Sequence, residues 1–283
     1  MIYGLVAALG WGSADFGGAV AGRRIGSLAT VLVAQGLSAV IVTIVFFGAG
    51  HGVGELAPIV WWIVLNGVVS AGAYTTHYRA LQLGPMVVVS PVSAAYAVVG
   101  VALSVVILGE RPSALALVGA FVTVIGVMLA STDLKKLIAG THGIPAGLPW
   151  AIAAAVMFGI GGFILGWASK EVGAIPALWG SRTAQVICFG AMAALRPHEL
   201  RQVGRNVGTA VAVATGIVDL VGVLALVFGA AAGFLSIVLA ASAIFPLIAV
   251  ALSVAFLHER PVPNQIVGAV VVVSGLILLG LGS

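Results

Sequence analysis

Ionisable side chains within apolar runs are the residues of this sequence best placed to do chemistry. They are Asp15, His77, Arg79, Arg182 and Asp219. Because a charge in an apolar environment is costly, such residues are usually kept for binding a ligand or for pairing with one another. If they share a cavity, Arg182 would hold a carboxylate through its planar fork, and an acid would hold the positive end of a zwitterion such as an amino acid. Pairing that holds helices together is the alternative.

Proton exchange is a second chemistry open to the acids. A carboxylate of Asp15 or Asp219 in a cavity of low dielectric could release a proton as a ligand binds, so a proton is a candidate partner of the site. His77 lies between Tyr74 and Tyr78 in the sequence. A lone histidine in such surroundings is more often a hydrogen-bonding residue than a proton relay.

Aromatic residues near these positions could form walls against an aromatic or cationic ligand. In membrane proteins aromatic side chains also mark the lipid–water interface, and Trp61, Trp62 and Trp150 fit that role because they lie near the ends of apolar runs. Arg79 also lies near the end of a run, where its side chain can reach water. The candidate binding residues are Trp11, Asp15, Tyr74, His77, Tyr78, Tyr96, Trp179, Arg182 and Asp219.

The composition indicates which elements must position these residues. The 283-residue chain is 61% hydrophobic and only 7% charged, so it cannot cover a surface that faces water. Its apolar runs do not alternate as the strands of a membrane barrel would, which leaves helices, since these satisfy their own backbone hydrogen bonds in lipid. With about 20 apolar residues needed per crossing, we expect ten membrane helices, near 2–21, 28–49, 58–81, 84–107, 112–131, 146–168, 175–195, 206–229, 232–257 and 262–281.

Several functional classes find no support in the sequence. Cys188 is the single cysteine, so neither a disulfide framework nor a cysteine metal site can form. The zinc-protease, serine-hydrolase and nucleotide-binding signatures are missing, so we expect no enzyme activity, no cofactor and no metal. The positive charge lies in short loops and reports orientation in the membrane, not affinity for nucleic acid. The lipid bilayer and a small molecule are the expected partners, and the chain could be a monomer or a homodimer.

An internal repeat divides the chain into two halves, 1–138 and 139–283. Residues 101–105, Val-Ala-Leu-Ser-Val, recur at 250–254, and in the same register residues 110–112, Glu-Arg-Pro, recur at 259–261. A looser match sets Trp11-Gly12 against Phe158-Gly159, which extends the repeat to the first helix of each half. Each half therefore holds five helices, so the second half must enter the membrane from the opposite face. Such inverted pairs are typical of transporters that alternate between outward-open and inward-open states, with a non-transporting membrane subunit as the alternative.

Two further patterns concern packing and orientation. Pro91 and Pro246 fall within the fourth predicted helix of each half, where they should bend it. The pairs Gly18/Gly22, Gly162/Gly166 and Gly229/Gly233 have the spacing at which helices approach closely. Most lysines and arginines lie in loops after odd-numbered helices, which should face the cytoplasm of a multi-pass protein of the inner (plasma) membrane, with both termini on the other face.

The repeated segments resemble a known family. The stretch from Ser90-Pro91 through residues 108–112 (Leu-Gly-Glu-Arg-Pro) to Gly119 and Gly126 resembles the EamA repeat of the drug/metabolite transporter superfamily, and the second copy runs to Gly275. The resemblance implies ten helices and a central cavity that exports or exchanges small metabolites, such as aromatic or other amino acids, or organic cations, without ATP. The first-helix glutamate of the small multidrug members has no clear counterpart here, where the acid is Asp15.

Overall fold

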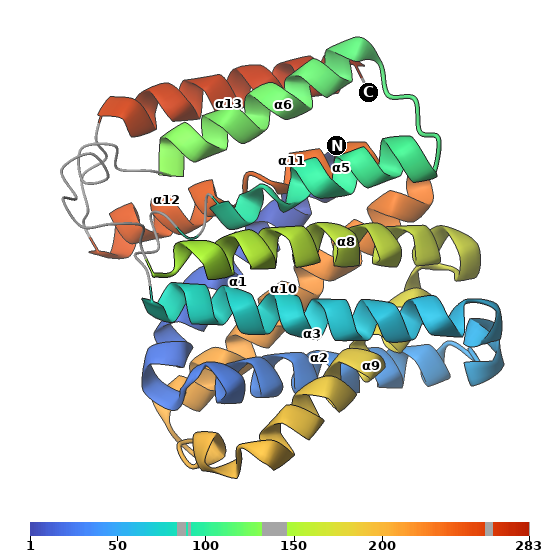
Figure 1. Ribbon diagram of the computed structural model, residues 1–283, viewed down its shortest axis with the longest axis vertical. Coiled ribbons are helices and arrows are strands. Elements are labelled where there is room, and N and C mark those ends of the chain that lie inside the picture. The colour runs from blue at the N-terminus through green and yellow to red at the C-terminus, as the bar shows by residue number, and fades with distance from the viewer. Residues whose placement is uncertain (84–88, 90–91, 132–145, 258–262, 283) are drawn as a thin grey trace.

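Helices account for all the regular secondary structure of the described part of the chain. The computed structural model describes residues 1–83, 89, 92–131, 146–257 and 263–282. In chain order its elements are α1 (Ile2–Ile25), α2 (Ser27–Gly48), the 3-10 helix η1 (Val53–Ile59), α3 (Val60–Leu83), α5 (Tyr96–Ile107), α6 (Ala114–Ser131), α8 (Leu148–Val172), α9 (Ala174–Leu195), the 3-10 helix η2 (Pro197–Leu200), α10 (Val207–Ala232), α11 (Leu235–Ser242), α12 (Phe245–Leu257) and α13 (Pro263–Gly282). Figure 1 shows them as one bundle, with α6 and α13 side by side along one edge.

Several of these helices are long and apolar enough to cross a membrane. Four of the described ones meet that standard on length and composition, namely Ser27–Gly48, Val53–Ala80, Leu148–Val172 and Val207–Ala232. Shorter apolar helices cover Val92–Ile107, Ala114–Leu129, Leu235–Ile248 and Ile266–Leu279. α1 and α9 have 24 and 22 residues, but they carry the charged residues Asp15 and Arg182. The chain is therefore an all-helical membrane protein, as its composition predicts.

The fourth predicted helix of each half is not continuous. In the second half the predicted span 232–257 is interrupted, because α11 ends at Ser242 and α12 begins at Phe245. Pro246 lies in the first turn of α12, and because it has no N–H it cannot bond the carbonyl of Ser242, the residue at which α11 ends. The proline that was expected to disturb the helix therefore lies where the helix breaks. In the first half the helix is interrupted by a turn at Ala95, one residue before α5 begins. Pro91 lies outside the described residues.

The two breaks fall at equivalent positions of the repeat, and the turns of the two halves agree as well. Tyr96 and Phe245, which begin α5 and α12, are 149 positions apart, the same offset as Val101 and Val250. The turn between α1 and α2 is made by Gly26 at φ 87° and ψ 157°, and the turn between α8 and α9 by Gly173 at φ 91° and ψ 158°. A positive φ favours glycine over residues with a side chain. The same turn is therefore built twice, 147 positions apart.

Equivalent glycines make equivalent contacts between the halves. A Cβ placed on Gly12 in α1 would meet the carbonyl oxygen of Phe245 and lie 2.5 Å from Cβ of Ile248. A Cβ placed on Gly159 in α8 would meet the carbonyl oxygen of Tyr96 and lie 2.5 Å from Cβ of Val99. Each first helix thus packs on the fourth helix of the other half in the same way. The repeat in the sequence is a pseudo-two-fold arrangement in space.

We expect Gly12→Val and Gly159→Val to destabilise the protein to a similar extent. Each added side chain would press on a carbonyl oxygen of the opposite half, and overpacking of this kind costs about 1–3 kcal/mol. Thermal unfolding in detergent would measure the loss. Gly36→Val in α2 is the control, because a Cβ there would meet nothing within 4 Å. Unequal losses at Gly12 and Gly159 would argue against the pseudo-symmetry.

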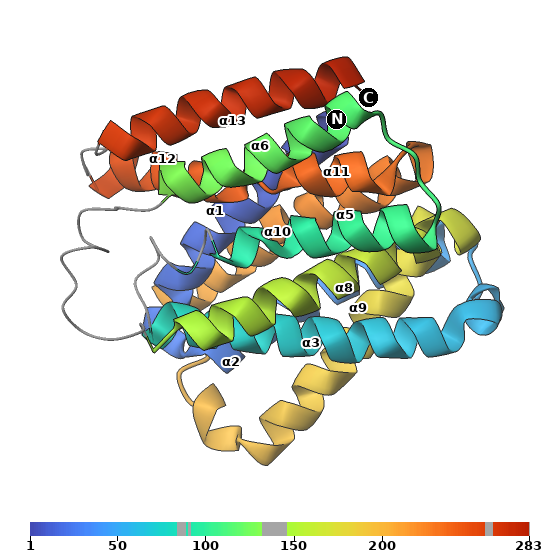
Figure 2. The same ribbon diagram turned by 45° about the horizontal axis from the view of Figure 1, so that its top comes forward.

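The last helix of each half packs against its own counterpart. A Cβ on Gly126 would lie 2.6 Å from the backbone nitrogen of Val272, and one on Gly275 would lie 2.5 Å from the backbone nitrogen of Thr123. The contact is reciprocal, because Gly126 and Gly275, and likewise Thr123 and Val272, are 149 positions apart. Figure 2 shows this pair, α6 and α13, at the edge of the bundle, beyond α5, α11 and α12.

Candidate functional site

A central cavity lies between the two halves, near the middle of the helices that line it. Its empty volume, counted out to solvent, is about 910 Å³. That space suits a small organic molecule. The lining residues come from both halves: Trp11, Ala14, Asp15, Gln35, Ser70, Tyr74, His77, Tyr78, Ser93, Tyr96, Phe158, Gly161, Gly162, Leu165, Ser181, Arg182, Gln185, Thr215, Asp219, Val223, Leu226 and Phe245.

A buried ion pair stands at the centre of the lining. Arg182 on α9 donates from Nη2 to Oδ2 of Asp219 on α10 over 2.6 Å, and both side chains are almost fully buried. Tyr74 donates to the other oxygen of Asp219 over 2.9 Å, while Gln35 donates to Oδ2 over 3.2 Å. Nη1 of Arg182 donates to the side-chain oxygens of Gln35 and Gln185. This network satisfies both oxygens of Asp219 and both Nη atoms of Arg182, as a buried pair requires, but it leaves out Nε of Arg182.

A second polar group lies on the same cavity and centres on His77. Nε2 of His77 is 3.3 Å from Oδ1 of Asp15, and Nδ1 is 3.0 Å from Oγ of Ser93. If the proton is on Nε2, the histidine donates to Asp15 and accepts from the Ser93 hydroxyl. Each ring nitrogen then has a partner, in agreement with the prediction that His77 is a hydrogen-bonding residue. It also fixes one oxygen of Asp15.

Two polar atoms of the lining are left without a partner. Among the described residues, Oδ2 of Asp15 and Nε of Arg182 are buried and make no hydrogen bond within the protein. One is an acceptor on a carboxylate and the other is a donor on a guanidinium. Because a buried polar group without a partner is costly, a bound molecule would gain by bonding these two atoms, which have almost no accessible surface and are reached only if side chains of the lining move. A ligand with a positive group and a negative group would satisfy both.

Aromatic rings enclose the cavity around these polar groups. Trp11, one turn before Asp15 on α1, packs edge-on against Tyr96 with ring centroids 6.1 Å apart, and Tyr96 contacts Phe245 at the same separation. Phe158 contacts the rings of Tyr74 and His77 at 5.1 and 5.6 Å. Rings of this kind can stack on an aromatic ligand or face a cation.

The structure brings together most of the candidate binding residues. Trp11, Asp15, Tyr74, His77, Tyr78, Tyr96, Arg182 and Asp219 all line the cavity. Trp179 does not: its ring stacks on Phe46 with centroids 4.2 Å apart, and its Nε1 donates to Thr43, so it joins α2 and α9 away from the lining. Arg79 is exposed on α3, in agreement with a side chain that reaches out of the bundle.

Reasoning from the sequence missed the neutral residues of the site. Gln35 and Gln185 bind Arg182, and Ser93 binds His77. Glutamine and serine are too common for their type alone to mark a site. The repeat held a signal, however, because Gln35 is 147 positions before Arg182, the offset that relates Gly26 to Gly173.

The charges of the cavity do not follow the pseudo-symmetry of the backbone. At the offsets of the repeat, Arg182 corresponds to Gln35, and Asp219 to Ser70. All of these line the cavity, as does Gly162, the counterpart of Asp15. Two similar halves therefore enclose a lining whose ionisable groups occur once each. No cluster of three histidine, cysteine or acidic residues that could hold a metal occurs among the described residues.

Comparisons with known proteins agree with the fold and the repeat. A solved structure described only as "Crystal structure of protein" is similar to this chain, with a TM-score of 0.77, 18% identity, and coverage of 99% of this chain and 96% of that one. A likeness at this identity shows the fold alone. A search of curated proteins finds no match. The sequence model of the EamA-like transporter family matches residues 1–132 and again residues 145–281. The chain belongs to the EamA-like transporter family and is a membrane transporter of the drug/metabolite type.

Proposed function

We propose that the protein is a secondary transporter of small zwitterionic metabolites, with amino acids as the substrate class. One observation carries the proposal: the two unpartnered atoms of the lining are Oδ2 of Asp15 and Nε of Arg182. An ammonium group would bind the former and a carboxylate the latter, each through a hydrogen bond to a charged group. The aromatic rings of Trp11, Tyr96 and Phe158 would then contact the side chain of the substrate.

Alternating access is the mechanism that we propose for this cavity. Two halves of five helices, related by an axis in the membrane plane, can exchange conformations and so expose one cavity to either face in turn. The reciprocal contacts between the halves support such an exchange. We further propose that the chain crosses the inner (plasma) membrane ten times, with the arginine-rich turns at Arg23-Arg24 and Arg196–Arg205 facing the cytoplasm. Export is then the direction that the family resemblance favours.

Transport of organic cations is the second candidate. Three of the four N–H groups on the Nη atoms of Arg182 donate to Asp219, Gln35 and Gln185, so a carboxylate could use only Nε and the remaining N–H of Nη2. Asp15, by contrast, has a carboxylate oxygen without a partner and aromatic residues nearby, which suits an amine without a carboxylate.

Flux in proteoliposomes would decide between these substrates. A panel of radiolabelled amino acids and organic cations would be tested with and without a pH gradient, which also shows whether protons are coupled. For an amino acid that is transported, we expect the corresponding amine without a carboxylate, and the N-acetyl derivative without a positive charge, to compete at least about tenfold more weakly, because each loses a hydrogen bond to a charged group.

Other outcomes of the flux experiment would change the substrate class or contradict transport. An amine that competes as well as its amino acid would favour the cation transporter, because the donor on Arg182 would then not be used. No flux of any compound by folded and inserted protein would contradict transport of either class.

A further inference from the structure

α11 lies between the cavity and one end of the bundle. Its eight residues, Leu235–Ser242, are all buried. At its inner end Ser242 is hydrogen-bonded to Tyr96, which lines the cavity. The residues of α11 itself do not line it. The helix is thus enclosed on every side and stands between the cavity and the turn that follows α10.

Close contacts hold α11 against helices on both sides. A Cβ on Gly100 in α5 would lie 2.6 Å from Cδ1 of Leu239, and one on Gly162 in α8 would lie 3.3 Å from Cδ2 of the same leucine. Gly166, one turn further along α8, leaves room for Leu235 in the same way. α5 belongs to the first half of the chain and α8 to the second. α11 therefore packs between α5 and α8, at the interface of the two halves, which we call the seam.

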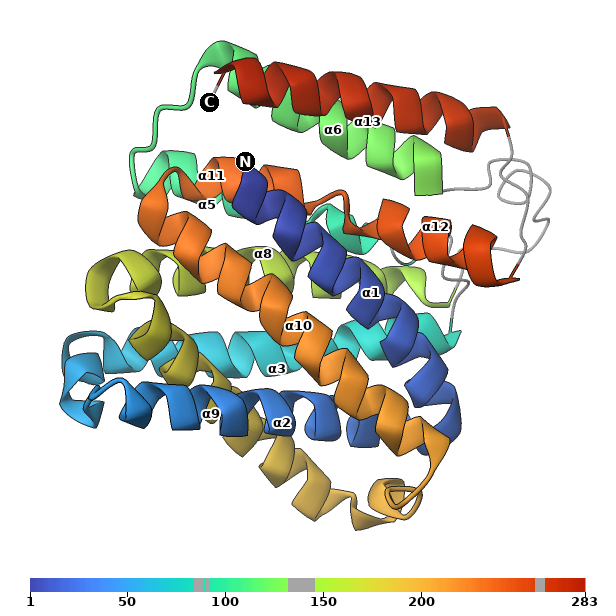
Figure 3. The ribbon, with the colours of Figure 1, turned by 180° about the vertical axis from the view of Figure 1, so that it is seen from behind.

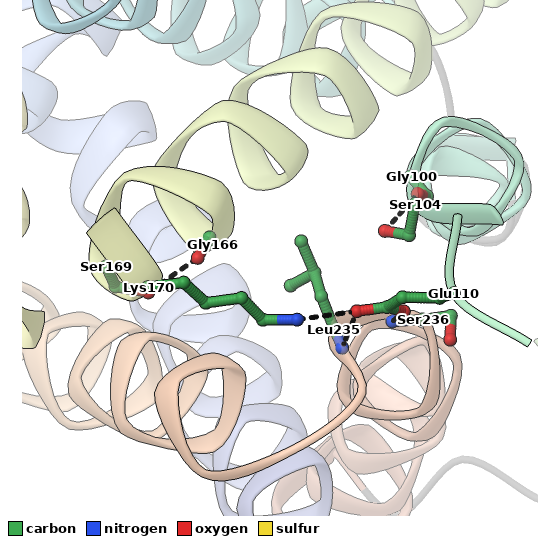
Figure 4. A network of polar contacts seen from close by, with 8 residues as sticks. All are labelled: Gly100, Ser104, Glu110, Gly166, Ser169, Lys170, Leu235 and Ser236. Atoms are coloured by element: carbon green, nitrogen blue, oxygen red, sulfur yellow. Dashed lines mark hydrogen bonds and ion pairs between the residues drawn. The ribbon is translucent and has the colours of Figure 1, made fainter. Parts of the chain in front are cut away.

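A carboxylate of the first half fastens the start of α11. Figure 4 shows Glu110, in the loop after α5, reaching the backbone of α11 and Lys170 near the end of α8. Its Oε1 accepts from the backbone nitrogen of Leu235 over 2.9 Å and from Nζ of Lys170 over 2.7 Å, and Oε2 accepts from the nitrogen of Ser236 over 3.0 Å. The backbone nitrogen of Glu110 in turn bonds Ser104 of α5. The Glu110 latch (Glu110, Lys170, Leu235 and Ser236) thus spans the seam.

The latch is charged at neutral pH although its carboxylate is almost fully buried. Burial alone would raise the pKa of Glu110, but the bonds from Lys170 and from the nitrogens of Ser236 and Leu235 outweigh it and hold the pKa below its usual value. The two backbone donors are the free N–H groups at the start of a helix, where a negative charge is stabilised. Separating α11 from α5 would leave these donors and Lys170 without their acceptor.

We propose that α11 is the gate of the cavity at the Glu110 end of the molecule, and that the Glu110 latch holds it shut in the state seen here. Opening towards that face requires α11 to leave the seam, and the latch must break first. Glu110 acts as a positioning residue, because it does not line the cavity. The inference rests on the alternating access proposed above, but it does not depend on which substrate is carried.

Thiol labelling of the cavity from each face would test the gate. In a Cys188→Ser background, Val223→Cys would place one cysteine on the cavity lining. A membrane-impermeant maleimide would be added to one face or the other of proteoliposomes of known orientation. We expect Glu110→Gln to raise the labelling rate from the Glu110 face about tenfold or more, and to lower labelling from the opposite face, because charge-assisted hydrogen bonds to one state are lost. Lys170→Met should act in the same direction but less.

The control is Glu171→Gln, which removes an exposed carboxylate beside Lys170 and should change neither rate. Unchanged rates in folded Glu110→Gln protein, or rapid labelling of the unaltered latch from the Glu110 face, would overturn the gate. A rise from both faces would also overturn it, because that pattern indicates loosened packing and not a shift between two states. Amino acid flux is measured separately, so a gate that responds in a protein without such flux would contradict only the substrate class.

Discussion

Asp219→Leu is expected to lower the free energy of unfolding by about 3–5 kcal/mol, because it leaves a buried guanidinium without its counter-charge. Arg182 is 3% exposed, and no other described carboxylate contacts it. Arg182→Met should cost a similar amount for the reverse reason, although Tyr74 and Gln35 would still donate to Asp219. Thermal unfolding in detergent, followed by tryptophan fluorescence, would measure both losses.

The double variant Arg182→Met/Asp219→Leu tests whether both losses of stability come from the broken ion pair. Replacing both members of a buried pair by apolar residues of similar size is often neutral, so the double variant should recover most of the stability that each single variant loses. Its binding of substrate should not recover, since Nε of Arg182 is gone. If the two losses simply add, the side chains are not coupled and the ion pair does not stabilise the fold.

Asp15→Asn is expected to weaken amino acid binding by roughly 10- to 100-fold, because a hydrogen bond to a charged group contributes about 1.5–3 kcal/mol. The amide can still accept from His77, so the local structure and the thermal stability should change little. Binding would be measured by isothermal titration in detergent with a substrate found in the flux panel. The effect should fall on ligands that carry an ammonium group.

Two further variants serve as controls for Asp15→Asn. Asp15→Glu keeps the charge but moves it by one methylene, so it should retain part of the affinity. Glu199→Gln removes a carboxylate from η2, which does not line the cavity, and should leave binding unchanged. Equal affinity in Asp15→Asn and the unaltered protein would show that Asp15 does not hold the substrate.

Much of the fold follows from the sequence because lipid imposes strong constraints. Apolar runs longer than a membrane crossing can only be helices, and matching glycines and charges revealed the repeat. Pro246 predicted a disturbed helix, but the sequence could not show that the helix stops between Ser242 and Phe245, since both sides of this break are equally apolar. Spacing alone also misjudged close contacts. Gly162 and Gly166 both pack on α11, but a Cβ on Gly22 or Gly233 would meet nothing within 4 Å.

For the site, the type of a residue predicted its place in the cavity better than its position along the helix did. Charges within apolar helices need a polar place inside the bundle, and Asp15, Arg182 and Asp219, selected on that ground, all line the cavity; their role in binding stays a prediction. The ion pair of Arg182 with Asp219 could not be predicted, since it depends on how α9 and α10 are rotated about their axes. Trp179 was misplaced for the same reason: a single turn of α9 separates it from Arg182, yet its ring points to Phe46.

The exchange of partners between the halves has a consequence for how the chain can be divided. α1 packs chiefly on α10 and α12, and α8 chiefly on α3 and α5, so the first helix of each half is held by the other half. Figure 3 shows α1 lying along α10. Among the described residues the main buried cluster draws on both halves, so neither half has a separate core there. Expressed separately, the halves should be degraded, whereas co-expression of the two fragments should rebuild one folded unit.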